Sequence, residues 1–244
     1  HKLNKHIYIK IIKMKFISQI FQKFLNRLSI IIDIIFFGIK NDLKQEASIR
    51  TAMRFLIQKF KRKEISVLEI GTRFGDSAKV ILKTLNIKKY IIIDPFISYE
   101  DYKIDDANKI MKNGDEIFNE TKIKLEKLSK NVIFFRKFSN DENTLNKIEH
   151  ESLDFIFIDG NHEYKYVLED LRNYYPKLKS EGVLIGDDFN HRAKKNDFLN
   201  TKSNLSNNKG VYEAVEEFSK EHNMTYLTFG HQAGYPKLFC FKKL

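Results

Sequence analysis

Five short apolar runs recur between residues 65 and 188, and this recurrence constrains the fold more than any other feature. Apolar residues within each run are largely continuous and do not alternate with polar ones, which is typical of strands buried on both faces. Stretches with helical spacing separate most of the runs. The pattern predicts an α/β fold with a parallel sheet and helices on both faces. The predicted strands are 65–70, 90–94, 131–137, 153–159 and 182–188.

The remaining segments complete this layout. A first helix is predicted from Ile49, Met53, Leu56 and Phe60, which share one helical face. The segment 225–241 is predicted to form two strands joined by a loop. Further helices are predicted at 77–85, 112–130, 164–178 and 211–221.

Acidic residues stand at the ends of four of the five predicted strands. They are Glu69, Asp94, Asp159 and the pair Asp187 and Asp188. A single acid often starts a loop. The carboxyl ends of parallel strands, however, meet at one edge of the sheet, where open α/β sheets bind their ligands. Four such ends therefore predict a ligand site at that edge.

The stretch "VLEIGTRFGDSAKVIL" joins the first strand to a helix through Gly71 and Gly75. Glycine allows a sharp turn and a close approach of backbone to ligand. We expect Asp76 or Ser77 to cap the helix. Asp94 is placed to accept the hydroxyls of a ribose. Dinucleotide sites use G-x-G-x-x-G, whereas this loop is G-x-x-x-G, so a pyrophosphate is not favoured.

The pattern acid-x-Gly-x-x-x-Gly-x-Ser resembles motif I of class I S-adenosylmethionine-dependent methyltransferases. "FIFIDGNHEYKYVLEDL" and "GVLIGDDF" are similar to the family of macrolide-sugar and other small-molecule O-methyltransferases, which is related more distantly to catechol O-methyltransferase. The resemblance covers residues 46–244. It implies a Rossmann-like sheet of seven strands, mostly parallel, with the last strand antiparallel.

The resemblance also implies roles for individual residues. Ser139 would lie by the adenine and Asp94 by the ribose. His162 and Asp159 would be catalytic, with His162 as the general base, and Asp159 would also contact both cofactor and metal. The implied magnesium ligands are Asp159, Asp187 and Asp188. The implied S-adenosylmethionine site comprises Glu69, Gly71, Thr72, Arg73, Phe74, Gly75, Ser77, Asp94, Ser139 and Asp159.

Elementary chemistry agrees with these roles. Methyl transfer to a hydroxyl requires that the hydroxyl oxygen, the methyl group and the sulfur lie in line, and that the hydroxyl loses its proton. Carboxylates suit Mg²⁺, bound metal lowers a hydroxyl pKa, and histidine can take the proton. Simpler explanations stay open: Asp159 could begin a turn, Asp187 and Asp188 a solvated loop, and His162 could cap a helix.

The polar stretch 191–209 contains few apolar anchors, and we expect it to be a mobile lid beside the site. Candidates for contact with the acceptor are His191, Arg192, His231 and Tyr235, although ordinary surface is the favoured explanation for each.

The amino-acid composition mainly indicates which binding partners the protein has. The net charge is +11, but it comes from scattered lysines without an arginine-rich, aromatic-interleaved cluster, which argues against nucleic acid. We therefore expect a small-molecule hydroxyl acceptor. One cysteine, Cys240, excludes an internal disulfide and favours the cytoplasm.

The chain is predicted to comprise an extension, 1–45, and a methyltransferase domain, 46–244. Residues 1–13 precede Met14, a plausible start, and are left out of the fold argument. Segment 16–39 is apolar, but Lys23, Arg27 and Asp33 argue against a membrane span. It is expected to be an amphipathic helix that packs on the domain, on a second subunit in a dimer, or peripherally on a membrane.

Two other functions remain compatible with the sequence. One is an NAD(P)-dependent oxidoreductase on a Rossmann fold, which the incomplete glycine fingerprint disfavours. The other is a non-catalytic module that binds S-adenosylmethionine and is tethered to a membrane or partner by the N-terminal helix.

Overall fold

The computed structural model describes residues 48–97, 113–190, 210–232 and 235–244, together with Leu28, Ile31, Ile32 and Ile35. The chain divides into a unit of residues 1–45 and a unit of residues 46–244, and the second is described below. The expected lid, 191–209, and nearly all of the expected helix 16–39 lie outside the described residues. Within the described ranges, no helix is long and apolar enough to cross a membrane.

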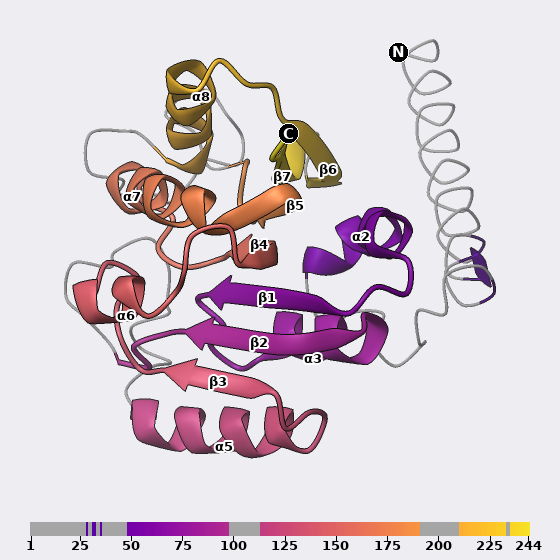
Figure 1. Ribbon diagram of the computed structural model, residues 1–244, viewed down its shortest axis with the longest axis vertical. Helices are drawn as coiled ribbons and strands as arrows, with labels where there is room; N and C mark the ends of the chain where they lie inside the picture. Colours follow the sequence, from indigo (N-terminus) through magenta and orange to yellow (C-terminus); the bar gives the residue numbers. More distant parts are fainter. Residues whose placement is uncertain are drawn as a thin grey trace, which may run out of the picture. The chain divides into compact units, whose positions relative to one another are not determined.

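Strands and helices alternate along the second unit, as the apolar runs predicted (Figure 1). The strands are β1 (Ile65–Ile70), β2 (Ile87–Ile93), β3 (Val132–Phe135), β4 (Leu153–Ile158), β5 (Leu178–Gly186), β6 (Leu227–Gln232) and β7 (Tyr235–Lys242). The α-helices are α2 (Met53–Phe60), α3 (Asp76–Thr84), α5 (Gly114–Glu126), α6 (Glu142–Asn146), α7 (Tyr164–Tyr174) and α8 (Val211–Glu221). Two 3₁₀ turns, η2 (Ser48–Ala52) and η4 (Tyr175–Lys177), precede α2 and β5.

All seven strands form one sheet in the order β3-β2-β1-β4-β5-β7-β6. β1 to β5 are parallel, and β7 runs antiparallel to both β5 and β6. The expected Rossmann-like sheet with an antiparallel last strand is thus confirmed. Ile70 of β1 pairs with Ile93 of β2 and with Ile158 of β4. This register brings the residues after each strand to one common edge.

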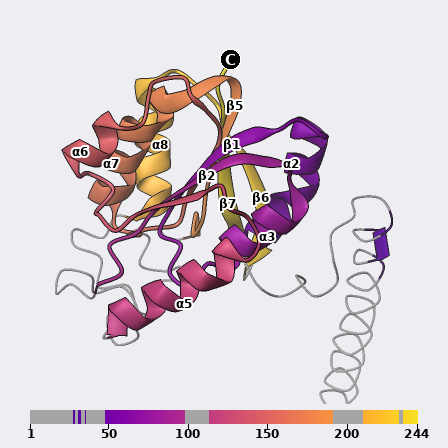
Figure 2. The same cartoon turned by 60° about the horizontal axis from the view of Figure 1, so that its bottom comes forward.

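Helices cover both faces of the sheet, with α6, α7 and α8 on one side and α2, α3 and α5 on the other (Figure 2). Leu168 and Leu171 of α7 and Phe218 of α8 are buried in one core with Leu68 and Ile156 of the sheet. Each fully buried apolar side chain of this size contributes about 1.5–3 kcal/mol. The strand ends therefore stand on a rigid, two-sided support.

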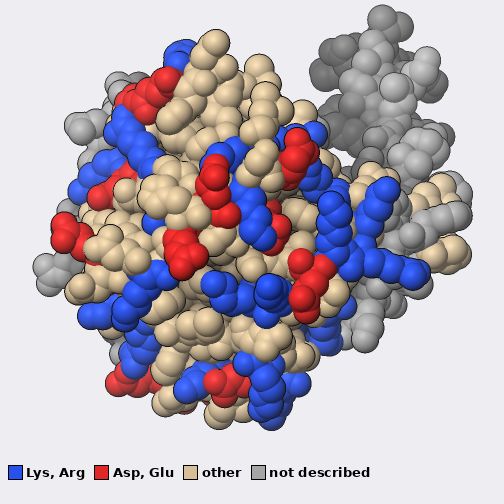
Figure 3. All heavy atoms as spheres, viewed as in Figure 1, with Lys and Arg blue, Asp and Glu red and all other residues tan. Residues whose placement is uncertain are grey.

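Several exposed basic residues lie at the edge where the parallel strands begin, opposite the strand-end acids. Exposed basic residues there include Lys61, Arg62 and Lys63 before β1, Lys88 in β2 and Lys130 before β3. In Figure 3, blue side chains crowd the right-hand side of the unit, where β1 and β2 begin in Figure 1.

The structure corrects several sequence-based boundaries. β5 begins at Leu178 and not at Gly182, because its first residues include exposed, charged positions that hide the apolar pattern. α6 was not predicted; it has five residues and is capped by Asp141, whose side chain accepts from the Thr144 N–H. The expected helix 112–130 is shorter, and the first predicted helix begins as a 3₁₀ turn.

Candidate active site

The loop between β1 and α3 contains three residues with positive φ: Gly71 (80°), Arg73 (49°) and Gly75 (70°). A Cβ atom at Gly71 would lie 2.2 Å from the carbonyl oxygen of Asp159. The close approach that requires glycine here is therefore between two protein loops, and contact of Gly71 with the cofactor stays a prediction. The close approach also places the loop directly against the end of β4.

The predicted cap of α3 was wrong. Gly75 occupies the cap position in a left-handed conformation, and no side chain caps the helix. Asp76 instead accepts from Lys124 Nζ of α5 at 2.6 Å, and the same ammonium donates to the carbonyl of Phe74. The loop is thus attached to α5.

Glu69, near the end of β1, is fully buried. Its Oε2 atom accepts from the Tyr90 hydroxyl at 2.8 Å and from the Thr72 hydroxyl at 3.2 Å. Its Oε1 atom has no hydrogen-bond partner among the described residues. Burial is the main reason that the pKa of Glu69 rises to about 8. An unsatisfied buried oxygen points to a donor that a ligand would supply.

Asp94, directly after β2, is 6% exposed. Its two oxygens accept from the backbone N–H groups of Arg73 and Phe96, each at 2.8 Å. Burial raises its pKa, although these hydrogen bonds act in the opposite direction. A carboxylate has about four acceptor positions, so Asp94 can still accept from a ribose hydroxyl.

The remaining residues of the loop differ in their exposure. Thr72 and Ser77 are buried, whereas Phe74 is 39% exposed. The Arg73 guanidinium lies 5.1 Å from the Phe74 ring centre. Its buried Nε atom has no hydrogen-bond partner within the described part of the chain. A buried, unsatisfied donor in this loop is a second group that a ligand could satisfy.

A cavity of about 570 Å³ opens beside Asp94, between the ends of β2 and β3. It is lined by Pro95, Ile97, Arg136, Lys137, Phe138, Asn140 and Asp141. Ser139 itself is half-buried and is tied to α7: its carbonyl accepts from the Tyr174 hydroxyl at 2.6 Å, and its side chain hydrogen-bonds Asp170. Burial raises the pKa of Asp170 to about 7. Ser139 thus positions the loop beside the cavity.

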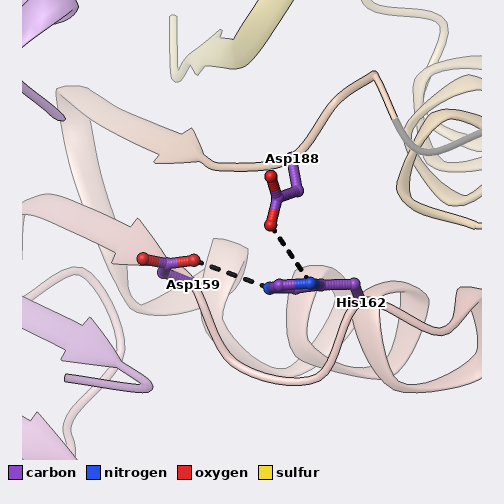
Figure 4. Close-up of side chains that lie close together, drawn as sticks. All are labelled: Asp159, His162 and Asp188. Carbon is purple, nitrogen blue, oxygen red and sulfur yellow. Dashed lines mark ion pairs between the residues drawn. The ribbon is translucent and has the colours of Figure 1, made fainter. Parts of the chain in front are cut away.

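Asp159, His162 and Asp188 form the strand-end cluster, which β4, the loop before α7 and the end of β5 bring together (Figure 4). His162 lies between the two acids, with Nε2 3.6 Å from Asp159 Oδ1 and Nδ1 3.1 Å from Asp188 Oδ2. One potential ligand atom from each residue lies within 4.8 Å of the others.

The electrostatics of the cluster hold a proton on His162. Burial is the largest single influence and would lower the pKa of His162, but Asp188, Asp159 and Asp187 together outweigh it, and the pKa rises to about 9. The pKa of Asp159 rises through burial and through the charge of Asp187. Asp188 has φ 51°, a left-handed conformation that costs a non-glycine residue free energy and is characteristic of functional sites. Glu163 stands at the cap position of α7, so His162 does not cap that helix.

Asp187 is not part of the strand-end cluster. Its Oδ1 atom accepts from the N–H of Asp188 at 2.7 Å and lies 3.4 Å from Lys237 Nζ. Lys237 also lies 3.1 Å from Asp188 Oδ1. The sequence reasoning missed Lys237. The available signal was the alternation in β7, which places Lys237 on the same strand face as the fully buried Phe239 and Phe241.

Two asparagines beside the cluster were also missed. Asn161 Nδ2 and Asn190 Oδ1 are buried and have no hydrogen-bond partner in the described ranges. Each asparagine lies within two residues of a cluster member in the sequence. This proximity was the only sequence signal that could have indicated them. Of the suggested acceptor contacts, His231 lies in β6 and Tyr235 in β7, while His191 and Arg192 lie outside the described residues.

Comparisons with known proteins agree with this geometry. A family model described as a methyltransferase domain matches residues 68–189, half of the chain. An uncharacterised protein, R132 of Acanthamoeba polyphaga mimivirus, is 26% identical over 136 residues, which are 55% of this chain and 56% of that protein. The chain thus spans about half the length of this curated relative.

Solved structures share the fold. One is assigned as a caffeoyl-CoA O-methyltransferase of Staphylococcus aureus, with a TM-score of 0.52, 19% identity and coverage of 82% of this chain and 93% of that one. Another is an rRNA methylase of Streptococcus thermophilus, with a TM-score of 0.52, 15% identity and coverage of 82% and 98%. At this identity the likeness concerns the fold, and acceptors of both kinds occur on it.

The sheet order, the glycine loop and the strand-end acids define a class I S-adenosylmethionine-dependent methyltransferase. The family match then makes the assignment: the chain belongs to the methyltransferase-domain family. The alternative of a nicotinamide-dependent oxidoreductase is thereby set aside.

Proposed function

We propose that the protein transfers the methyl group of S-adenosylmethionine to a hydroxyl of a sugar, glycan precursor or other small metabolite. The observation that carries this proposal is the position of His162 between Asp159 and Asp188, where the backbone of Asp159 lies against the loop that would hold the cofactor. A proton-accepting group beside a methyl donor suits oxygen acceptors, because a neutral hydroxyl is a poor nucleophile until its proton leaves.

The residues present fit S-adenosylmethionine, which supplies a methyl group on a positively charged sulfur. Glu69 Oε1 and Arg73 Nε are buried groups that lack partners among the described residues and could meet the polar methionine end. Asp94 would accept from the ribose. Ile97 and Phe138, which line the adjoining cavity, offer apolar surface for the adenine. These residues bind and orient the donor, and orientation accounts for much of the rate of a displacement reaction.

His162 is the residue that we propose takes the hydroxyl proton. Asp159 and Asp188 hold its ring from both sides and fix its orientation. Their negative charges also favour the protonated ring, so His162 acts as a base only when those charges are compensated in the reacting complex.

A divalent cation fits the same acids. Mg²⁺ commonly binds through one or two carboxylates and retains several waters. Asp159 and Asp188 would supply those carboxylates, with Asp187 beside them. When bound, such an ion would compensate their charge and lower the pKa of a coordinated hydroxyl. His162 is then not a metal ligand, and its ring remains available to the proton.

The test is release of S-adenosylhomocysteine in the presence of a panel of sugars, sugar nucleotides and catechols. We expect turnover with at least one hydroxyl acceptor, and His162→Ala should lower that turnover about a hundredfold while cofactor affinity is unchanged. Equal turnover in the folded variant would refute the base. Cofactor binding without transfer to any hydroxyl of the panel would favour a non-catalytic module or another acceptor class.

A further inference from the structure

Lys237 places a fixed positive charge against the two adjacent acids after β5. Its Nζ atom lies 3.1 Å from Asp188 Oδ1 and 3.4 Å from Asp187 Oδ1, and its side chain is 26% exposed. The other oxygen of Asp188, Oδ2, faces His162 at 3.1 Å. Both oxygens of Asp188 therefore already face a nitrogen of the chain.

Strand pairing determines this position. β7 pairs with β5 in a register that sets Phe239 opposite Gly186, and the N–H of Phe189 donates to the carbonyl of Lys237 at 2.8 Å. Phe239 and Phe241, on the same strand face as Lys237, are fully buried. The backbone of Lys237 is thus held in the sheet beside the two acids. A largely buried ammonium is costly unless it is paired, which keeps it there.

A divalent cation at Asp159 and Asp188 would have to share Asp188 with this ammonium. The carboxylates attract the metal, whereas the ammonium a few ångströms away repels it, and such interactions are poorly screened in a partly buried site. Removal of the lysine charge would leave one positive charge fewer beside Asp187 and Asp188, which favours a metal in its place.

We infer that Lys237 is a built-in counter-ion that sets the divalent-cation affinity of the strand-end acids and keeps that affinity low. This inference rests on the metal site of the proposed function. It goes beyond that proposal by naming the residue that controls metal affinity. A purely structural salt bridge would differ in one respect: its loss would change stability and leave metal affinity unchanged.

The experiment measures Mn²⁺ affinity of the full chain by calorimetry, with Mn²⁺ as a probe of divalent ions. Lys237→Met keeps the length of the side chain and removes its charge, and we expect at least about tenfold tighter binding than in the wild type. Lys237→Arg retains the charge and should retain weak binding. Adding Asp188→Asn to Lys237→Met should abolish the gain.

The matched control is Lys179→Met. Lys179 also forms an ion pair, 2.8 Å from Asp154, but in β5 at the opposite edge of the sheet. An unchanged affinity in Lys237→Met, or an equal gain in Lys179→Met, would overturn the inference. If Lys237→Met does not fold, Lys237→Gln replaces it, with the same tenfold criterion.

Failure of this inference can be told apart from failure of the proposed function. No Mn²⁺ binding in any variant would overturn the inference and the metal site together. Release of S-adenosylhomocysteine, measured separately with Mg²⁺ and with chelator, would still show whether methyl transfer takes place. Tighter Mn²⁺ binding in Lys237→Met without methyl transfer would support the inference and count against the proposed reaction.

Discussion

Replacing Tyr90 with phenylalanine tests the buried Glu69 on which the cofactor site is built. Tyr90 is fully buried in β2, so the substitution removes one oxygen and leaves the ring packing in place. Glu69 Oε2 would keep only the Thr72 contact at 3.2 Å, and Oε1 already lacks a partner in the described part of the chain. Loss of a partner at a buried polar group costs about 1–3 kcal/mol.

The cost should depend on pH in a definite direction. The pKa of Glu69 is about 8 in the folded protein and 4.5 when unperturbed. Because the pKa of this carboxyl is raised on folding, Glu69 ionises at a lower pH in the unfolded chain than in the folded protein. Its contribution to stability is therefore complete below pH 4.5 and is lost as pH rises through about 8. The Tyr90 hydrogen bond lowers this pKa, so its loss penalises the ionised form most. We expect about 1 kcal/mol of destabilisation at pH 6 and about 2–3 kcal/mol at pH 9.

Urea unfolding of the wild type and Tyr90→Phe at the two pH values measures this difference. The control is the same substitution in a Glu69→Gln background, where the side chain no longer ionises and the cost should be the same at both pH values. An equal cost at pH 6 and pH 9 in the Glu69 protein, or a larger one at pH 6, would refute the reasoning.

Two further predictions concern the loop and the metal. Gly71→Ala should destabilise the protein by about 2 kcal/mol or more. The reason is that the new Cβ atom would lie 2.2 Å from the Asp159 carbonyl oxygen, at a residue with φ 80°. A melting temperature equal to that of the wild type would contradict the close contact between the two loops. Treatment with chelator should abolish methyl transfer and Mg²⁺ should restore it, as measured by S-adenosylhomocysteine release, whereas full activity in chelator would remove the metal from the mechanism and leave the transferase intact.

The sequence predicted the central sheet well, because β1, β2 and β4 contain continuous apolar runs that only burial on both faces explains. It missed α6 and the start of β5, where short length or exposed charge hides the pattern. It also did not show that Gly71 packs against the backbone of Asp159, since a glycine signal does not reveal which group comes close.

The strand-end site was predicted only in outline. Four acidic strand ends indicated the edge, but the choice between Asp187 and Asp188 depends on the left-handed backbone at Asp188, which sequence does not show. Lys237 joins the site through antiparallel pairing of β7 with β5, and no local spacing connects it to acids 49 residues earlier.

The central claim is that the edge formed by Glu69, Gly71 and Asp94 binds S-adenosylmethionine. Calorimetric titration of the full chain with S-adenosylhomocysteine tests it most directly, because it needs neither the acceptor nor the metal. We expect one ligand per chain, and Asp94→Ala should weaken binding about tenfold or more through loss of a charge-assisted hydrogen bond to the ribose. Absence of binding to the folded wild-type chain at millimolar ligand, or equal affinity in Asp94→Ala, would contradict the account.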